Sequence, residues 1–542
     1  MVSRGLTVRV AILATLFALV VYLLTLAPGI SWHNDGADSG DLVAAVATGG
    51  VPHPSGYPTY LLVGSLFARL PVGDLAYRLN VMSAAAAAGA TGLTLLAILA
   101  SLNDAGYGKR EVRLFAAGAA ALTFAFSSIL WSQAVIAEVY ALNALFAAGV
   151  GCLALLARAT GRWWLWVAAA GAFGLGLGNH LSLMALAPVG LVLYGASWWS
   201  GVRRSQSVSV SVATETKGAR PGVLGSVAML LAFAAGLAVY LALPLRAAQQ
   251  PPVNWGGAHT WDGFIWLVSG QAYAPLVAAL PLTQLPGRIL AAAALLCRQA
   301  AWWGVPVAYL GVRAMWERDR PLAMATLLGG VVLLVYAVGY NTSDSYVYLI
   351  PVAMILAFWI GWGLPEAFEQ IGSLSGGLSA RGRRVAGWAL RGGAVLLISV
   401  PLAANFQTVD ASHDLGAHDY GVKVLTSAAQ SAVIIADSGT DTFPLWYFRY
   451  AEGRRPDVAI VSGRLLAYAW YRDSVRRWHP DVAGVADEND AAQVVQTLIR
   501  VNLPQYPVYL TTTTWELPAG YRLAPEGILY RVERDWAWMK SQ

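Results

Sequence analysis

The chain has 542 residues and a formal net charge of +6, and 57% of its residues are hydrophobic while only 12% are charged. A soluble domain carries roughly a quarter charged residues, so this composition excludes an ordinary soluble protein and indicates one that lies in a bilayer. The basic residues form short clusters between apolar runs, which excludes a nucleic-acid-binding face. Cys152 and Cys297 both fall in apolar segments, and we expect them to pack in the membrane core instead of forming a disulfide or a metal site.

About eleven apolar segments are long enough to cross a membrane, since a spanning helix needs about 20 residues. In chain order they lie near residues 8–28, 76–102, 112–130, 141–158, 163–179, 181–198, 222–244, 300–315, 321–340, 346–363 and 386–404. The first resembles a signal peptide, but it has a long core and lacks a convincing cleavage site, so we expect an uncleaved anchor. The sequence therefore predicts an α-helical polytopic membrane domain over residues 1–404.

Lys and Arg occur in every second connection between these segments, which is the pattern of the positive-inside rule. The basic clusters are Arg4 and Arg9; Lys109, Arg110 and Arg113; Arg158 and Arg162; Arg203, Arg204, Lys217 and Arg220; Arg313, Arg318 and Arg320; and Arg381, Arg383 and Arg384. We therefore expect a cytoplasmic N-terminus in a plasma (inner) membrane. An odd number of spans then places the C-terminus outside the cytoplasm.

The first outer connection, within residues 29–75, reads HNDGADSGDLVAAVATGGVPHPSGYP over residues 33–58 and has no Lys or Arg. We expect a short helix that starts near Asp38 and stops at Gly49, followed by a turn that prolines stiffen around His53 and Tyr57. Asp38 and Asp41 lie on one face of the first helical turn. Two interpretations stay open, because these carboxylates can cap the helix or form part of a site.

Other outer connections carry isolated polar residues at the ends of spans. Glu138 in AEVYALN and His180 in GNH can each belong to a site or serve only the local structure. Arg246 in LALPLR is a cation on the side that the positive-inside rule disfavours, which indicates a phosphate partner or else snorkelling to lipid head groups. Asn254 follows in the same connection, and Asp344 in NTSDSYVY is interpreted as a loop cap.

The character of the sequence changes after residue 404. Short β-branched runs in SAVIIADSG, PDVAIVSG, PVYLTTTT and GILYRVER alternate with helical stretches such as DAAQVVQTLIR. We expect residues 405–542 to form a small extracytoplasmic α/β domain. Residues 205–219 are polar and predict a flexible cytoplasmic loop.

These motifs resemble a family of membrane enzymes. DSGDL followed by HPSGYP is similar to the DSGEL…HPPGYP signature of proteins related to the eukaryotic protein O-mannosyltransferase that modifies plexin-type IPT domains, within the GT-C class of glycosyltransferases. The similarity continues through WSQAVIAEVYALN, GLGNH, LPLRAAQQPPVNWG, NTSDSYVY and DSGTDTFPLWYFRYAEGRRPDVAIV, and so covers most of the chain. Asp41 stands where the family usually has Glu, and Ser55 replaces the second Pro of HPPGYP.

The resemblance implies a GT-C-like fold whose first outer loop carries the catalytic acid. Asp38 is the best match for this acid, and Asp41 is the second catalytic candidate. The candidates for binding the donor or another substrate are His53, Tyr57, Glu138, His180, Arg246 and Asn254. The implied donor is a sugar, such as mannose, on a polyprenyl phosphate, and the acceptor is a hydroxyl of a protein Ser/Thr or of a glycan.

Two other functions are compatible with a polytopic membrane protein. A transporter or flippase of lipid-linked sugars would carry ionisable groups inside its spans or interrupted helices near the midplane, whereas here the polar residues cluster at outer span ends. A membrane sensor would not need the DSGD…HPSGYP loop. Paired aspartates could hold Mg²⁺ or Mn²⁺, but the resemblance favours a metal-independent transferase, and we expect no cofactor beyond the lipid-linked donor.

Overall fold

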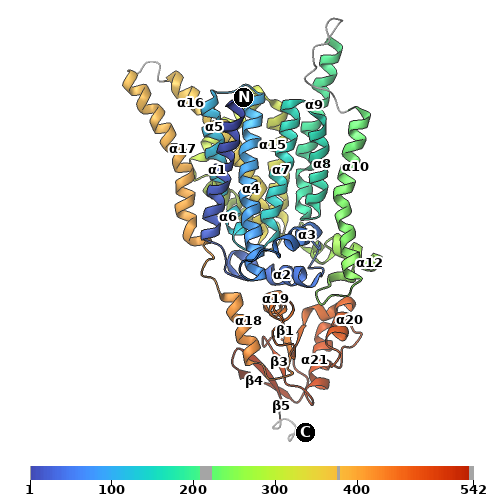
Figure 1. Ribbon diagram of the computed structural model, residues 1–542. Coiled ribbons are helices and arrows are strands. Elements are labelled where there is room, and N and C mark those ends of the chain that lie inside the picture. Colours follow the sequence, from blue (N-terminus) through green and yellow to red (C-terminus); the bar gives the residue numbers. More distant parts are fainter. Residues whose placement is uncertain (1, 208–221, 375–378, 536–542) are drawn as a thin grey trace.

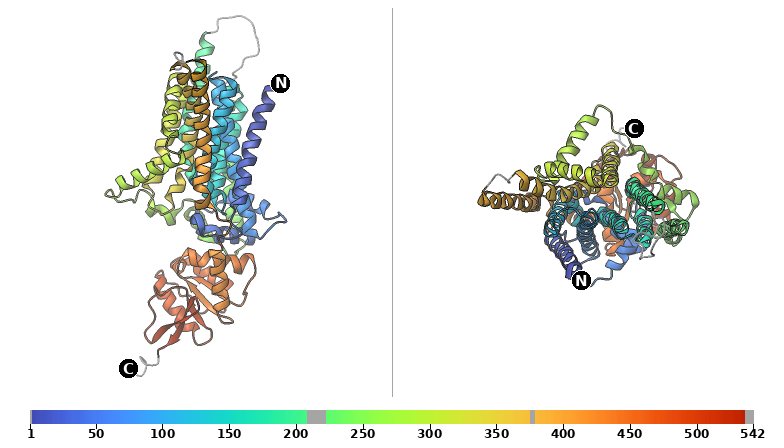
Figure 2. Two further views of the ribbon diagram at one scale, coloured as in Figure 1. Left: turned by 90° about the vertical axis from the view of Figure 1, so that its left-hand side faces the viewer. Right: turned by 90° about the horizontal axis from the view of Figure 1, so that it is seen from above.

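The computed structural model describes residues 2–207, 222–374 and 379–535 and shows a bundle of apolar helices with a small α/β domain at one end (Figures 1 and 2). Within these ranges, eight spans are long and apolar enough to cross a membrane. They contain α1 (Val2–Leu24), α4 (Leu75–Asp104), α7 (Val139–Thr160), α9 (Ala187–Ser207), α10 (Val223–Leu237) with α11 (Ala242–Ala247), α15 (Arg320–Gly339), α16 (Ile350–Leu374) and α17 (Ala380–Val409). The chain is a multi-pass membrane protein, as predicted.

The other predicted spans coincide with bent or short helices. The first bent pair, α5 (Arg110–Ala125) and α6 (Ser128–Ala134), turns by 64°, and the second, α13 (Leu285–Gln299) and α14 (Gly304–Arg318), turns by 91°. Counting each pair as one span gives up to ten, and the remaining predicted segment is the shorter apolar helix α8 (Trp163–Leu177). The predicted fold class is confirmed, with eight to ten spans by length in place of about eleven.

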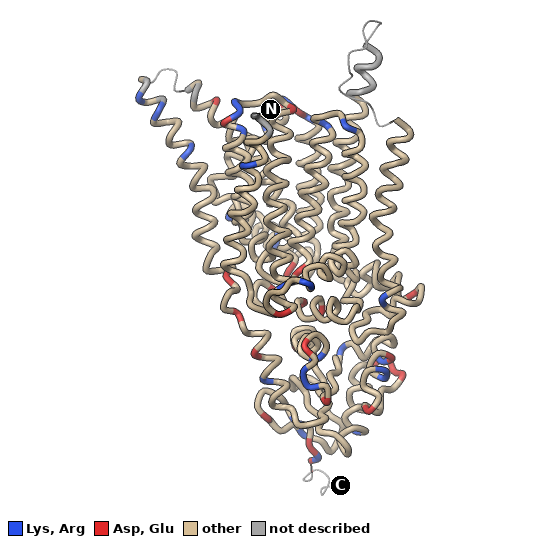
Figure 3. Tube along the Cα trace, in the orientation of Figure 1, with Lys and Arg blue, Asp and Glu red and all other residues tan. Residues whose placement is uncertain are grey.

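Charge is unevenly distributed along the bundle. Figure 3 shows Lys and Arg gathered at the end of the bundle that lies away from the α/β domain. Lys217 and Arg220, and most of the polar loop predicted at 205–219, lie outside the described residues. The bundle therefore has one basic end and one end that carries the α/β domain (Figure 3).

Short elements connect the spans next to the α/β domain (Figure 1). The helix α2 starts directly after Asp38 and ends at Gly49, which adopts a left-handed backbone with φ +66° that glycine tolerates. Both boundaries agree with the sequence prediction. The connecting elements are η1 (His33–Asp38), α2 (Ser39–Thr48), α3 (Pro58–Phe67), η2 (Leu181–Leu186), η3 (Ala238–Leu241), η4 (Trp255–Gly257), α12 (Trp261–Val268), η5 (Gln271–Leu276) and η6 (Ser345–Leu349).

The C-terminal domain is built on a five-stranded sheet of order β2-β1-β3-β5-β4. Strands β1, β2 and β3 are parallel and fully buried, which fits their β-branched sequences, and β5 and β4 add an antiparallel hairpin. The elements are α18 (Gly416–Ser427), β1 (Val433–Ala436), α19 (Gly439–Trp446), η8 (Tyr447–Ala451), β2 (Ala459–Ser462), η9 (Arg464–Ala467), α20 (Ala469–Trp478), α21 (Ala491–Asn502), β3 (Val508–Leu510), β4 (Tyr521–Glu526) and β5 (Leu529–Arg534).

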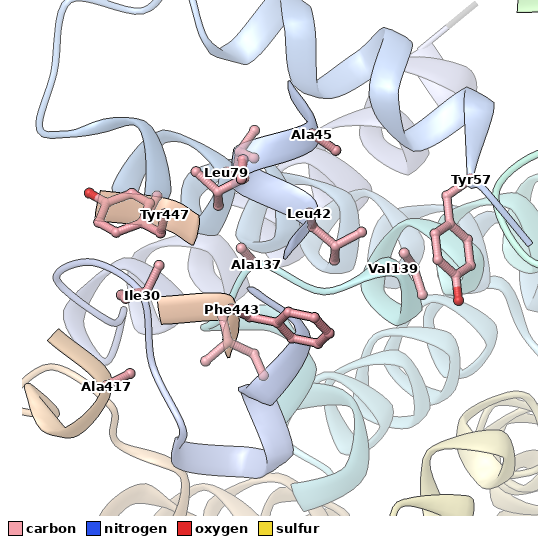
Figure 4. Close-up of a cluster of buried hydrophobic side chains, with 14 of the residues drawn as sticks. Ile30, Leu42, Ala45, Tyr57, Leu79, Ala137, Val139, Ala417, Phe443 and Tyr447 are labelled. Carbon is pink, nitrogen blue, oxygen red and sulfur yellow. The ribbon is translucent and has the colours of Figure 1, made fainter. Parts of the chain in front are cut away.

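The two parts of the chain share one hydrophobic core. Figure 4 shows Ile30 and Leu42, from the first connection, in the same cluster as Phe443 and Tyr447 of the C-terminal domain. The backbones of α2 and α19 approach so closely that a Cβ added to Gly40 would overlap the carbonyl oxygen of Phe443. The first helix after Asp38 is therefore held between the bundle and the C-terminal domain.

Candidate functional site

Asp41 and His53 form the centre of the candidate site. Asp41 lies in the first turn of α2 and is fully buried. Its Oδ2 accepts a hydrogen bond from the backbone N–H of His53 at 2.9 Å and lies 2.7 Å from Nδ1 of the ring, while its Oδ1 accepts from Nε1 of Trp255 at 3.0 Å. Both oxygens are thus occupied by protein groups. Asp41 is thus placed to orient His53, and the catalytic role predicted for it from the sequence stays a prediction.

Asp38 faces the opposite ring nitrogen of His53. Its Oδ2 lies 3.5 Å from Nε2, and 45% of its side-chain surface is exposed. Asp38 directly precedes α2, yet its carboxylate caps no described residue of the helix, and the carboxylate of Asp41 is turned toward His53. The geometry therefore does not support the capping interpretation. The side chains of Asp38, His53 and Asp41 therefore lie in series, and the accessible carboxylate at one end of this series is that of Asp38.

The crowding of acidic groups changes their proton affinities. Burial raises the pKa of Asp38, because protein surrounds the carboxylate even though water reaches part of it; the charge of His53 opposes this rise and that of Asp41 adds to it. Burial disfavours the charged form of His53, but Asp38 and Asp41 outweigh this effect and raise its pKa to about 9. At neutral pH His53 is therefore a cation next to Asp38.

Aromatic rings border this chain of residues. The ring of Tyr57 lies 5.0 Å from that of His53 and stacks on His180 at 6.0 Å, and His180 also contacts Tyr140 and Tyr348. Tyr57 has a left-handed backbone with φ +42°, a conformation that costs free energy for a bulky residue and that often occurs at functional sites. Burial and the charge of His53 lower the pKa of His180 to about 4, so His180 is neutral at pH 7.

Two further acids, Glu138 and Asp344, interact electrostatically within this site. Glu138 precedes α7 and is buried, and burial together with the charge of Asp38 raises its pKa well above the usual range. Asp344 precedes η6, but its side chain caps none of the described residues and instead accepts a hydrogen bond from Tyr140 at 3.4 Å. Its charge also acts on Asp38 and Glu138. The interpretation of Asp344 as a loop cap was therefore wrong, and Asp344 belongs to the acidic group of the site.

Arg246 and Asn254 lie beside the same loop. Val51 pairs with Asn254 in a parallel bridge, two residues before His53. Nη1 of Arg246 donates to the carbonyl oxygen of Gly50 at 3.3 Å, and no Asp or Glu in the described part of the chain forms an ion pair with it. The guanidinium therefore stays available to an anionic ligand. The structure thus brings all eight candidate residues to one end of the bundle.

Sequence reasoning missed Trp255. It follows Asn254 in the quoted motif LPLRAAQQPPVNWG, and the available signal was that a buried indole N–H needs an acceptor. In the structure that acceptor is Asp41. Among the described residues, no group of three or more His, Cys, Asp or Glu side chains is placed to hold a metal ion, so we propose no metal ligands.

Family models match two parts of the chain. Residues 38–201 match the N-terminal domain of the protein O-mannosyl-transferase TMEM260, and residues 417–502 match the TMEM260-associated domain 2. The first match begins at Asp38 and contains the loop of His53.

Sequence comparison extends this similarity over most of the chain. The protein O-mannosyl-transferase TMEM260 of Mus musculus is 26% identical over 515 residues, which cover 89% of this chain and 66% of the mouse protein. The protein of the same name from Dictyostelium discoideum is 20% identical over 516 residues, 86% of this chain and 58% of its own length. The chain therefore spans less than two thirds of the length of each of these relatives.

Solved structures show the same fold. ArnT from Cupriavidus metallidurans bound to undecaprenyl phosphate superposes with a TM-score of 0.58 at 13% identity, over 96% of this chain and 97% of ArnT. The apo form of ArnT gives a TM-score of 0.53 at 15% identity, also over 96% of this chain and 97% of ArnT. The comparisons confirm the predicted resemblance: the chain is similar in sequence to the TMEM260 protein O-mannosyl-transferases, and its fold is that of ArnT.

Proposed function

We propose that the chain is a membrane glycosyltransferase that moves a sugar from a polyprenyl-phosphate donor to an acceptor hydroxyl. The observation that carries this proposal is the accessible carboxylate of Asp38, backed by His53 and the buried Asp41 at the bundle end next to the C-terminal domain. The names of the two relatives support mannose as the sugar and a protein as the acceptor. The binding of undecaprenyl phosphate by ArnT supports a polyprenyl-phosphate lipid as the carrier.

In the proposed reaction, Asp38 is the general base. It takes the proton of the acceptor hydroxyl while the oxygen attacks the anomeric carbon, and the bond from that carbon to the phosphate oxygen breaks with its electron pair leaving on the phosphate. The raised pKa of Asp38 makes it a better proton acceptor than an ordinary carboxylate. Its negative charge also suits the oxocarbenium-like transition state. A single displacement of this kind inverts the anomeric centre.

Arg246 is the proposed partner of the leaving phosphate. A guanidinium matches a phosphate in shape and charge, and this one donates only to a backbone carbonyl among the described residues. The cationic His53 adds a second positive charge near the reacting atoms. Together these groups would stabilise the charge that develops on the phosphate as it leaves.

The proposed membrane orientation follows from the basic end of the bundle (Figure 3). The positive-inside rule assigns this end to the cytoplasm, so the site and the C-terminal domain would lie outside the cytoplasm, in a plasma (inner) membrane. The lipid carrier would then present its sugar at the outer surface of the membrane, while the polyprenyl tail remains in the bilayer. This arrangement favours a transferase over a flippase, whose ionisable groups would line the spans.

The test of this function combines cells and purified protein. Mass spectrometry of envelope proteins and glycolipids from deletion and complemented cells identifies the product, and purified protein in proteoliposomes is assayed with polyprenyl-phosphate mannose. We expect Asp38→Asn to keep its folded amount and to lose at least about 10²-fold in turnover, as the loss of a general base predicts. Normal transfer by a well-expressed Asp38→Asn protein would refute the role of Asp38 and make Glu138 the next candidate.

A further inference from the structure

Tyr273 lies in the site but was not singled out by the sequence. It belongs to η5, in the outer connection between α11 and α13, and its ring centroid lies 6.5 Å from that of His53 at an interplanar angle of 80°. The end of η5 is fixed from another connection, because the backbone N–H of Asn341 donates to the carbonyl oxygen of Leu276 at 3.0 Å. Tyr273 is therefore held against the ring of His53 by a part of the chain that lies more than 200 positions away from it.

The hydroxyl of Tyr273 differs from that of the second tyrosine next to His53. The ring of Tyr57 lies 5.0 Å from His53, and its hydroxyl donates to the carbonyl oxygen of Pro54 at 2.8 Å. The hydroxyl of Tyr273 has no hydrogen-bond partner within residues 2–207, 222–374 and 379–535, and it is not one of the unpartnered polar atoms that the protein seals from solvent. A ligand can therefore reach it without breaking a bond within the protein.

The charges around this hydroxyl determine what it can bind. Burial, followed by the charges of Asp38 and Asp41, raises the pKa of Tyr273 well above its usual value of 10. The hydroxyl thus keeps its proton at neutral pH and acts as a hydrogen-bond donor. Asp344 adds a third negative charge, and together these charges repel a phosphate but not an uncharged oxygen. The group that suits this hydroxyl is therefore a neutral acceptor.

The position of Asp38 limits which neutral acceptor this can be. In the proposed reaction the attacking oxygen lies about 2.6–3.2 Å from the carboxylate of Asp38, and the anomeric carbon lies about 3–3.5 Å from that oxygen. The sugar ring therefore begins within about 7 Å of Asp38, next to Tyr273. A hydrogen bond donated to the attacking oxygen would withdraw the electron pair that the attack needs, so the hydroxyl groups of the sugar are the suitable partners.

We propose that Tyr273 is a specificity-determining residue that binds the donor sugar, with its phenolic O–H donating to one hydroxyl group of the sugar ring. This inference rests on the proposed function and adds to it a residue that recognises the sugar. Arg246 is the proposed partner of the phosphate, so the sugar and the phosphate of the donor are bound by different side chains. The aromatic ring of Tyr273 borders the sugar, and its O–H fixes the orientation of the sugar.

The first test compares the donor with its sugar-free carrier. The purified full chain in detergent micelles is titrated with polyprenyl-phosphate mannose and with polyprenyl phosphate, as wild type and as Tyr273→Phe, which keeps the ring. We expect the Kd for polyprenyl-phosphate mannose to rise about fivefold to tenfold in Tyr273→Phe, in line with the loss of one hydrogen bond. The Kd for polyprenyl phosphate should change less than twofold. An equal rise for both lipids would assign the hydroxyl to the phosphate and overturn the inference, as would an unchanged Kd for both.

The second test identifies the sugar hydroxyl. A site built to hydrogen-bond a hydroxyl of its substrate discriminates against the analogue that lacks it. Turnover in proteoliposomes is therefore measured with each monodeoxy analogue of mannose on the same carrier. For one analogue we expect the wild type and Tyr273→Phe to have equal kcat/KM for the donor, because the partner of the lost O–H is already absent. A constant ratio between the two proteins for every analogue would contradict a contact with the sugar.

The matched control is Tyr309→Phe. Tyr309 is exposed on α14, and its hydroxyl also lacks a hydrogen-bond partner in the described part of the chain. We expect Tyr309→Phe to equal the wild type in every measurement and both variants to keep the wild-type melting temperature. A lower melting temperature of Tyr273→Phe alone would assign a structural role to its hydroxyl and overturn the inference. A wild type that consumes no donor would refute the proposed function, whereas normal consumption with unchanged binding by Tyr273→Phe would refute only the role of Tyr273.

Discussion

Asp41→Asn tests whether the buried carboxylate holds His53 in its charged form. Asparagine keeps one acceptor oxygen and replaces the other with an NH₂ group, which must face either the indole N–H of Trp255 or the N–H groups of His53. One buried hydrogen bond is therefore lost at any pH, at a cost of about 1–3 kcal/mol in the free energy of unfolding. A second loss concerns the charge of His53 and depends on pH.

The size of this second loss follows from the pKa of His53. A rise from 6.5 to about 9 corresponds to about 3 kcal/mol in favour of the folded protein, and Asp38 and Asp41 are its main causes. This stabilisation is fully present below about pH 6.5 and is lost as the pH rises through about 9. The part of it that depends on Asp41 should therefore disappear between these values, and Asp41→Asn should destabilise the protein less at pH 10 than at pH 6.5.

Thermal unfolding of the detergent-solubilised protein at both pH values measures this difference. Asp481→Asn, an exposed substitution in the C-terminal domain, is the control and should be neutral at both. Turnover of Asp41→Asn should also fall, but less than that of Asp38→Asn, because the base itself remains. An equal loss of stability at the two pH values would refute the proposed charge on His53.

If Arg246 binds the donor phosphate, Arg246→Lys keeps the positive charge but loses the planar, bidentate guanidinium, so the KM for the donor should rise about tenfold with little change in folding. An unchanged donor KM in Arg246→Ala would instead favour snorkelling of Arg246 to lipid head groups. Gly40→Ala should destabilise the protein by about 1–3 kcal/mol, since its Cβ overlaps the backbone of α19; a normal melting temperature would contradict the close approach. Turnover should fall with decreasing pH as Asp38 becomes protonated. Because the pKa of Asp38 is raised, the midpoint of this fall should lie above the ordinary aspartate value of 3.8. The pH profile of kcat measures the midpoint, and a midpoint at or below 3.8 would exclude the raised pKa. Reporter fusions after Arg384 and Gln542 should be cytoplasmic and external, respectively, and a reversal of both would place the site in the wrong compartment.

Much of the fold could be predicted because its signals are local. Runs of apolar residues located the spans, and β-branched runs located four of the five strands. The strand Tyr521–Glu526 was missed because its sequence, YRLAPE, contains a proline and two charges and forms an edge of the sheet. The bends between α5 and α6 and between α13 and α14 depend on packing, which hydropathy does not report.

The site was predictable as a set of residues but not as an arrangement. Asp38 and Asp41 are three residues apart and were both predicted to be catalytic, with Asp38 as the better match, yet the sequence did not indicate that one is accessible and the other fully buried. That difference arises from Trp255, more than 200 positions away, which occupies the second oxygen of Asp41. Asp344 was misjudged for the same reason, since its contact with Tyr140 is set by tertiary structure.

The contact of Gly40 with Phe443 can form only late in the synthesis of the protein. About 400 residues separate these positions in the chain, and at a synthesis rate of about 5–20 residues per second the second appears roughly 20–80 seconds after the first. During that interval the loop of Asp38 lacks the surface on which α2 rests. A ribosome that stops early would therefore leave an inserted bundle without an assembled site, so an incomplete chain could not act on the lipid carrier.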